Sequence, residues 1–187
     1  QEEERRSIPS IQLDYCFSKA DGSDYLNTIL VAIDCQTKMI SVHPVPSKGA
    51  NLRGQAEHLV RFSMALNYMD RVEFVSDAEP TMKSLLASVQ LMRQHLGYPT
   101  VVTHSRPGDK GRTAQVERVI QTLRRQSSTL VQMASDRCSL QLPGDQAIWP
   151  WSFVHAAWTL NRFVNHTTTQ MSPFELVYGR RYSGKVA

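Results

Sequence analysis

Three strand-like runs precede any helical segment, and this order is the strongest constraint on the fold. They span residues 11–17, 25–34 and 38–45 and are rich in β-branched, aromatic and apolar residues. Two short turn sequences, Ala-Asp-Gly-Ser and Asp-Cys-Gln-Thr, separate them. We therefore expect an antiparallel meander of three strands.

The second run is apolar on both faces, because Ile29, Val31 and Ile33 alternate with Leu30 and Ala32. Helices must then cover both sides of the sheet. The remaining pattern predicts helices over 52–69, 80–96, 114–134 and 149–165, a short capped helix in SPFELVYGRR, and strands over 72–76 and 100–104. This order predicts an α/β fold of ribonuclease H-like type, with three antiparallel and two parallel strands in one mixed sheet flanked by helices, although other α/β folds share it.

Composition limits the domain organisation and the class of partner. A chain of 187 residues with 41% hydrophobic residues can bury one substantial core, which we place at residues 11–180, with a linker at 1–10 and a tail at 181–187. The 21 Lys and Arg residues exceed the 17 Asp and Glu residues, which suits a polyanionic partner such as nucleic acid. The three cysteines have neither disulfide-framework nor zinc-site spacing, so we expect a reducing compartment. The sequence has no transmembrane or signal-peptide pattern and reads as a piece of a longer polypeptide.

Two aspartates lie where a strand would hold a carboxylate rigidly. Asp14 lies in the middle of the first strand, where an ionised group is costly unless it is paired, exposed at an edge or bound to metal. Asp77 follows the strand 72–76, at the carboxyl end where α/β sheets bind ligands. Asp77 or Glu79 could instead cap the next helix, and Glu79 could also compete as a metal ligand. Asp34 ends a strand and opens a turn, so turn capping is its expected role.

Glu117 is the third candidate acid and lies in the first turn of the helix 114–134. On a helical wheel it falls beside the apolar stripe, on a shoulder shared with Gln121 and Arg124. This shoulder could offer one metal ligand followed by two groups able to touch bases or phosphates. A solvated acid favoured by the helix dipole would show the same pattern.

Taken together, these segments resemble the catalytic core (rve domain) of retroviral and LTR-retrotransposon integrases. The resemblance runs from about Ile11 to Arg180 and rests on IQLDYCF, VEFVSDAEP, AQVERVIQTLRR and the ending WPWSFVHAAWTLNRFVNHTTTQMSPFELVYGRR. It implies that Asp14, Asp77 and Glu117 form a catalytic triad that binds two Mg²⁺ or Mn²⁺ ions. The implied function is DNA integration, in which a polynucleotidyl transferase joins element 3′ ends to target DNA.

The resemblance also implies partners and a location. DNA is the expected partner, with contacts from basic and polar residues near the proposed site, namely Lys110, Arg112, Gln121 and Arg124. Related integrases act as multimers, so a homo-oligomer is expected, and the tryptophans of the last long helix could pack the core or serve a subunit interface. Nuclear localisation as part of a larger polyprotein is a further expectation.

Two departures from the family pattern leave alternatives open. Ala78-Glu79 stands where the family has Asn-Gly after the second aspartate, and the loop SRPGDKGRTAQVE before Glu117 is unusual. A catalytically silent descendant that binds DNA or assembles with partners would tolerate both departures. A ribonuclease H proper would need a further acid, for which Asp34 and Glu79 are candidates.

Overall fold

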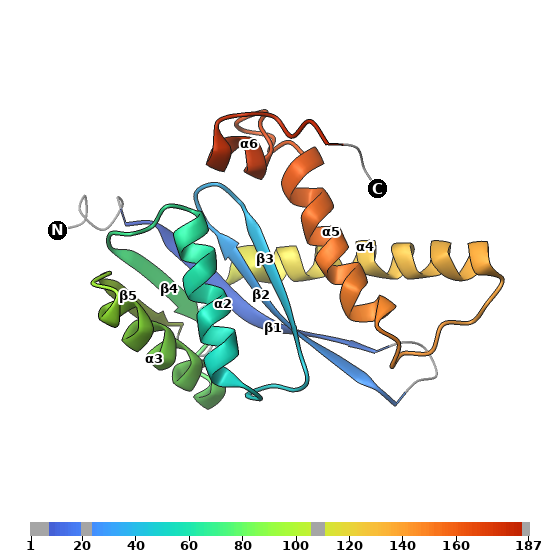
Figure 1. Ribbon diagram of the computed structural model, residues 1–187, viewed down its shortest axis with the longest axis horizontal. Helices are drawn as coiled ribbons and strands as arrows, with labels where there is room; N and C mark the ends of the chain where they lie inside the picture. Colours follow the sequence, from blue (N-terminus) through green and yellow to red (C-terminus); the bar gives the residue numbers. More distant parts are fainter. Residues whose placement is uncertain (1–7, 20–23, 106–110, 185–187) are drawn as a thin grey trace.

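A five-stranded mixed sheet forms the centre of the molecule (Figure 1). The computed structural model describes residues 8–19, 24–105 and 111–184. In these residues the strands lie in the order β3-β2-β1-β4-β5. Their bounds are β1 Ser10–Lys19, β2 Leu26–Asp34, β3 Ile40–Val45, β4 Val72–Ser76 and β5 Thr100–His104. The first three pair antiparallel, and β4 and β5 continue the sheet in parallel with β1. The predicted ribonuclease H-like mixed sheet is therefore confirmed.

Two helical layers cover the sheet, as the apolar faces of β2 require. The helices are α2 Leu52–Ala65, α3 Pro80–His95, α4 Ala114–Cys138, α5 Ile148–Phe163 and α6 Pro173–Tyr178. Helices α2 and α3 share a core with one face of the sheet, around Leu13, Leu30 and Phe74. Helices α4 and α5 pack on the other face, around Ile29, Val31 and Phe153. Residues that alternate along β2 thus enter opposite cores.

The pairing of β1 with β4 ends just before two of the candidate acids, and the crevice is our name for the region beyond this last pair. The strand pairs with β2 along its whole length, from Ile11 opposite Asp34 to Lys19 opposite Leu26. Its parallel pairing with β4 covers three residues and stops at Gln12 opposite Val75. Beyond this point the two strands separate at the carboxyl end of β4. The switch between strand directions is where open α/β sheets leave room for ligands.

Helix boundaries differ from the sequence prediction at a few ends. Helix α2 stops at Ala65, short of the predicted residue 69, because Asn67 adopts a left-handed conformation with φ 62°. Helix α4 runs on to Cys138, beyond the predicted residue 134, and ends at Ser139 with φ 52°. Ser10, placed in the linker by sequence, is the first residue of β1.

Helix α5 is fastened to the free edge of the sheet by one side chain. Asn161 accepts a hydrogen bond from the backbone N–H of Ile40 at 2.9 Å and donates one to its carbonyl oxygen at 2.8 Å. The amide therefore satisfies both backbone groups of an edge-strand residue.

The described helices include none with the length and apolar character needed to cross a membrane.

Candidate active site

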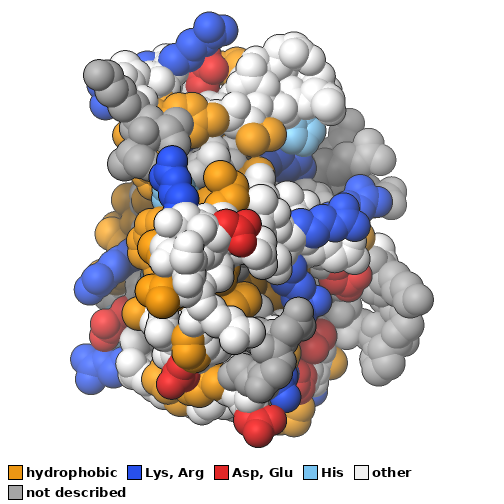
Figure 2. Space-filling model, turned by 90° about the vertical axis from the view of Figure 1, so that its right-hand side faces the viewer, with side chains coloured by type: hydrophobic (Ala, Val, Ile, Leu, Met, Phe, Trp, Pro, Cys, Tyr) orange, Lys and Arg blue, Asp and Glu red, His pale blue; other side chains and the backbone are white. Residues whose placement is uncertain are grey.

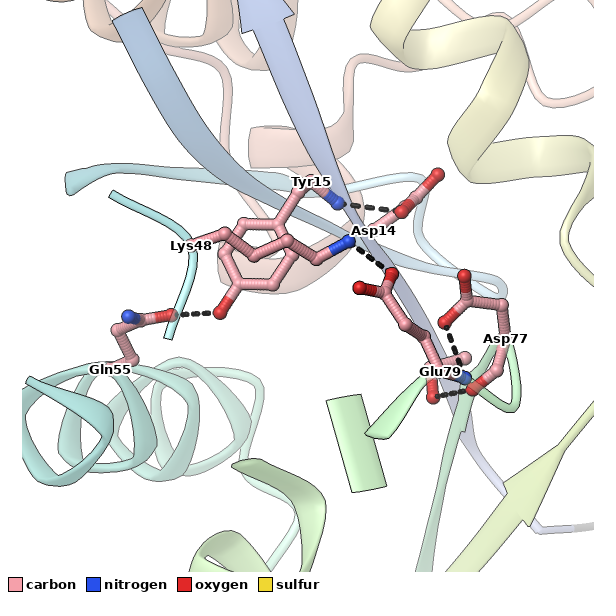
Figure 3. A network of polar contacts seen from close by, with 7 residues as sticks. Asp14, Tyr15, Lys48, Gln55, Asp77 and Glu79 are labelled. Carbon is pink, nitrogen blue, oxygen red and sulfur yellow. Dashed lines mark hydrogen bonds and ion pairs between the residues drawn. The ribbon is translucent and has the colours of Figure 1, made fainter. Parts of the chain in front are cut away.

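Asp14 lies on β1, and Asp77 directly follows the neighbouring strand β4. The last paired residues of β1 and β4 are Gln12 and Val75, and two positions further along each chain come Asp14 and Asp77. Parallel neighbours are separated by about 5 Å in the hydrogen-bonding direction, so both aspartates border the opening between the strands. Figure 3 shows both aspartates in the same close-up as Lys48 and Glu79.

The crevice makes Asp14 unusually hard to ionise. Its pKa is raised to about 6, and burial is the main cause. Repulsion from the charges of Asp77 and Glu117 contributes to this rise. The backbone N–H of Tyr15, which donates to Asp14 Oδ1 at 2.7 Å, and the positive charge of Lys48 both act in the opposite direction. The three predicted acids therefore lie close enough to interact electrostatically.

Glu117 reaches this region because β1 holds the start of α4. The buried side chain of Gln12 accepts hydrogen bonds from the backbone N–H groups of Gln115 at 3.1 Å and Val116 at 3.2 Å. The first turn of a helix leaves such groups without partners, so Gln12 acts as its cap. Glu117 is exposed, and its Oε1 accepts a hydrogen bond from the hydroxyl of Thr113 at 2.8 Å.

Glu79, the rival ligand, has a different partner. It precedes the first residue of α3 in an extended conformation, and its side chain makes no cap hydrogen bond. Its carboxylate instead forms an ion pair with Lys48, which comes from the loop between β3 and α2 (Figure 3). Asp77 accepts a long hydrogen bond of 3.4 Å from the backbone N–H of Glu79. The Lys48 pair occupies the carboxylate that would otherwise be available to a metal ion.

The donor set fits a hard cation, although the side chains do not already form a cage. Asp14, Asp77 and Glu117 offer carboxylate oxygens, which Mg²⁺ prefers, and their mutual repulsion is relieved by a bound cation. Within residues 8–19, 24–105 and 111–184, no group of three or more His, Cys, Asp or Glu side chains is arranged to hold a metal ion. Binding at this site would therefore require rotation of at least one carboxylate.

The predicted DNA contacts are dispersed. Arg124 donates to the carbonyl oxygen of Phe17 at 3.0 Å, so part of its guanidinium is bound to β1. Gln121 is exposed on the same helix. Arg112 lines a pocket of about 520 Å³ on the face of β1, β4 and β5, together with Gln12 and Glu73. Lys110 lies outside the described residues.

Asp34 is confirmed as a turn residue. It is fully buried at the end of β2, and its Oδ2 accepts hydrogen bonds from the backbone N–H of Thr37 at 2.7 Å and from the hydroxyl of Thr37 at 2.6 Å. Its other oxygen accepts a hydrogen bond from the hydroxyl of Tyr68 at 3.0 Å. Its place opposite Ile11 separates it from Asp14, so it offers no fourth acid to the crevice.

Sequence reasoning missed two residues of this site, Gln12 and Lys48. Gln12 carries a weak signal, because it lies two positions before Asp14 and therefore on the same face of β1. Lys48 carries none, since its loop meets Glu79 across 31 residues of sequence. His104 Nδ1 lies 3.2 Å from both the hydroxyl of Ser76 and the carbonyl oxygen of Asp77. It thereby supports the segment that carries Asp77.

Comparisons with known proteins reveal the fold of retroviral integrase catalytic cores. No family model and no curated protein sequence matches the chain. Among solved structures, the HTLV-2 integrase catalytic core domain in complex with magnesium, in its trimeric form, has a TM-score of 0.63 and 15% identity, over 92% of this chain and 99% of that one. The BIV integrase catalytic core domain has a TM-score of 0.58 and 14% identity, over 91% and 93%.

A longer chain also matches. A protein of the simian T-cell lymphotropic virus intasome, solved with a PP2A regulatory subunit, gives a TM-score of 0.67 and 17% identity over 96% of this chain. The chain spans 58% of the length of that protein. The structural likeness therefore extends over nearly all of this chain, at low sequence identity.

Proposed function

We propose that this chain is the catalytic core of an integrase, with residues 11–180 as its domain. The proposed activity is that of a polynucleotidyl transferase, which processes the 3′ ends of retroelement DNA and joins them to target DNA. The observation that carries the proposal is that Asp14 and Asp77 lie just beyond the last paired residues of β1 and β4, where Gln12 also holds the first turn of α4, which bears Glu117. Three acids that interact in one crevice, at the carboxyl end of β4, offer the oxygen ligands that phosphodiester chemistry requires.

The three acids share one role in this proposal. Asp14, Asp77 and Glu117 would hold two Mg²⁺ or Mn²⁺ ions, which when bound activate the attacking hydroxyl and stabilise the leaving oxygen. Gln12 orients the helix turn that presents Glu117. Because the pKa of Asp14 is about 6, this carboxyl keeps its proton in acid and binds cations poorly there. Joining should therefore fall as the pH drops below about 6.

A joining assay tests the chemistry. A disintegration-type DNA substrate is incubated with Mg²⁺ and the intact chain, or with Asp14→Asn, Asp77→Asn or Glu117→Gln. The three variants should each reduce joining to the background, whereas Asp24→Asn, which changes an exposed acid, should join DNA like the intact chain. If Asp14→Asn joined DNA as fast as the intact chain, the catalytic assignment would be wrong.

The second candidate is a catalytically silent integrase-derived domain that binds DNA or assembles with partners. The observation in its favour is the ion pair of Glu79 with Lys48 in the crevice, together with the lack of a preformed acidic cage in the described residues. A thermal unfolding scan separates the candidates, because a ligand that binds the folded state raises the melting temperature. Mg²⁺ should stabilise the intact chain and leave Asp14→Asn unchanged. A silent domain would show no Mg²⁺ response in either protein.

The proposed partners are DNA, as element ends and as target, and further copies of the chain in the nucleus. HTLV-2 integrase cores are described in dimeric and trimeric forms. On α5 of this chain, Trp151, His155 and Trp158 stack along one side, and Trp151 is 52% exposed. Figure 2 shows other exposed hydrophobic side chains between basic ones on one face. Light scattering after size exclusion should detect an oligomer that Trp151→Glu dissociates.

A further inference from the structure

Lys48 brings a positive charge into the acidic crevice from a loop outside the sheet. The loop connects β3 to α2, and the lysine side chain is 27% exposed. Its ammonium forms the ion pair with Glu79 and lies 5.3 Å from the centroid of the Tyr15 ring and 5.7 Å from that of Phe17. Figure 3 shows the lysine extending across Tyr15 toward Glu79. Two aromatic rings and a carboxylate thus fix the place of the ammonium.

The surrounding contacts hold this loop in one conformation. The hydroxyl of Tyr15 donates to Gln55 Oε1 at 2.6 Å, and Gln55 Nε2 donates to the carbonyl oxygen of Ala50 at 2.6 Å. Gly49 has φ +81°, and a Cβ there would lie 3.3 Å from Thr81 Cγ2. The positive φ favours glycine after Lys48, and any larger residue would also crowd Thr81 of α3. The position of Lys48 is set by β1 and α2 together.

The acidic residues near Lys48 explain why its positive charge would help a nucleic acid to bind here. Asp14, Asp77, Glu79 and Glu117 give the crevice a negative potential, which repels the phosphates of a nucleic acid. The ammonium acts on Asp14 as well as on Glu79. A lysine is a flexible point charge with three donors, suited to exchanging one oxygen partner for another. Phosphate oxygens are common partners of such lysines.

We propose that Lys48 binds a phosphate of the nucleic acid in this crevice, and that Glu79 holds the ammonium in place until the phosphate displaces it. This inference rests on the proposed function, because it takes DNA as the ligand. It gives Glu79 a role other than metal binding. It also gives a reason for one departure from the integrase pattern. This chain has Ala78-Glu79 where that pattern has Asn-Gly, and Glu79 pairs with Lys48.

Equilibrium DNA binding tests the proposal without any catalytic step. The anisotropy of a labelled DNA duplex is measured in EDTA over a range of salt concentrations, for the intact chain, Lys48→Met and Lys48→Arg. Loss of one phosphate contact should weaken binding about threefold to tenfold and reduce the slope of log affinity against log salt by about 0.9. Methionine keeps an apolar stem over the Tyr15 and Phe17 rings, and arginine should retain the affinity of the intact chain. Lys83→Met, which removes an exposed lysine of α3, is the matched control.

A double-mutant cycle separates displacement from general charge effects. Glu79→Gln should tighten DNA binding about threefold or more, because the ammonium is released. In the Lys48→Met background the same change should have a much smaller effect. The proposal is overturned if Lys48→Met matches Lys83→Met in affinity and salt slope, if the Glu79→Gln gain persists in full without Lys48, or if the intact chain binds no DNA at low salt.

The outcome is independent of the joining assay. If joining fails while Lys48→Met reduces the salt slope, the catalytic proposal is wrong and the phosphate contact stands. If joining depends on Asp14 while Lys48→Met binds DNA like the control, the phosphate contact is wrong and the catalytic proposal stands. Circular dichroism and thermal unfolding confirm that each variant is folded before binding is compared.

Discussion

Gln12 fastens the first turn of α4 to the strand that carries Asp14, because its Oε1 accepts a hydrogen bond from the backbone N–H of Gln115 at 3.1 Å. A second hydrogen bond, from the N–H of Val116, strengthens this link. The contact joins residues 103 positions apart in sequence. It sets the distance between the aspartate on β1 and the glutamate on α4, so the proposed chemistry depends on a residue that itself carries no charge.

Gln12→Ala should therefore impair joining without changing the affinity for DNA. The loss of a cap costs about 1 kcal/mol and lets the first turn of α4 fray, which moves Glu117 away from Asp14. We expect the rate of joining to fall about tenfold at unchanged DNA affinity. Gln12→Glu keeps an acceptor at the helix start and should recover part of the rate. Gln90→Ala, on the exposed side of α3, is the control, and an equal rate for Gln12→Ala would contradict the positioning role.

Asp14→Asn should stabilise the metal-free protein above pH 6. The folded carboxyl has a pKa of about 6 against 3.8 for an unperturbed aspartate, so its ionisation costs the fold free energy at neutral pH. Allowing for partial exposure, the variant should gain about 1 to 2 kcal/mol at pH 8. The gain should shrink as the pH falls from 6 toward 4, because the folded aspartate then takes up its proton. Urea unfolding in EDTA at pH 8 and pH 4.5 measures this, with Asp24→Asn as control.

A gain that did not depend on pH would point to better packing rather than to charge. An Asp14→Asn protein less stable than the intact chain at pH 8 would contradict the prediction outright.

His58 should give the opposite dependence on pH. Its pKa is lowered from 6.5 to about 4, mainly by burial and also by the positive charges of His43 and Arg61. Its ring stacks on His43 with centroids 4.4 Å apart, and its Nε2 lies 2.7 Å from the hydroxyl of Ser41. Below pH 6.5 His58 becomes protonated in the unfolded chain but stays neutral in the folded chain. The free energy of unfolding therefore falls as the pH drops toward 4.

The contribution of His58 to this loss should be about 2 kcal/mol after allowance for its partial exposure. His58→Asn should flatten the stability profile between pH 6.5 and 4 by that amount, as measured by urea unfolding at several pH values. His95→Asn, at the exposed end of α3, should leave the profile unchanged. Identical profiles for His58→Asn and the intact chain would refute the assignment.

Local patterns in the sequence predicted the strands and the elements that carry the acids, although they left the choice among α/β folds open. The meander followed from β-branched runs and short turns, and the capping role of Asp34 followed from its place at a strand end. The shoulder position of Glu117 followed from helical periodicity, with Val116 and Ile120 buried beside it. These features depend on residues within one or two turns of each other, so the sequence states them directly.

The remaining features depend on contacts between distant segments. The ion pair of Lys48 with Glu79 and the cap of α4 by Gln12 arise only after the sheet is assembled. Local periodicity carries no information about which loop will face a strand end. The burial of Arg93 could not be predicted locally either. From the sequence it is a basic residue near the end of α3, but its side chain is fully buried.

Arg93 should be among the residues most important for stability. Its guanidinium donates only to neutral oxygens, namely Ser63 Oγ at 2.6 Å, Thr100 Oγ1 at 2.9 Å and the carbonyl oxygens of Tyr68 at 2.9 Å and Asp70 at 3.0 Å. It therefore links α2, α3, β5 and the segment before β4. Arg93→Met removes the donor from the buried hydroxyl of Ser63 and from three partly buried oxygens, which should cost about 3 kcal/mol or more.

Arg93→Lys should also be costly, because an ammonium cannot reproduce the planar fork of donors that reaches all four oxygens. Urea unfolding at pH 7 gives the free energy of unfolding of both variants. Arg125→Met, which removes an exposed arginine of α4, should stay within about 0.5 kcal/mol of the intact chain. If Arg93→Met were as stable as Arg125→Met, the buried guanidinium would be replaceable by apolar packing, and the junction of α2 with β5 would be held by the hydrophobic core alone.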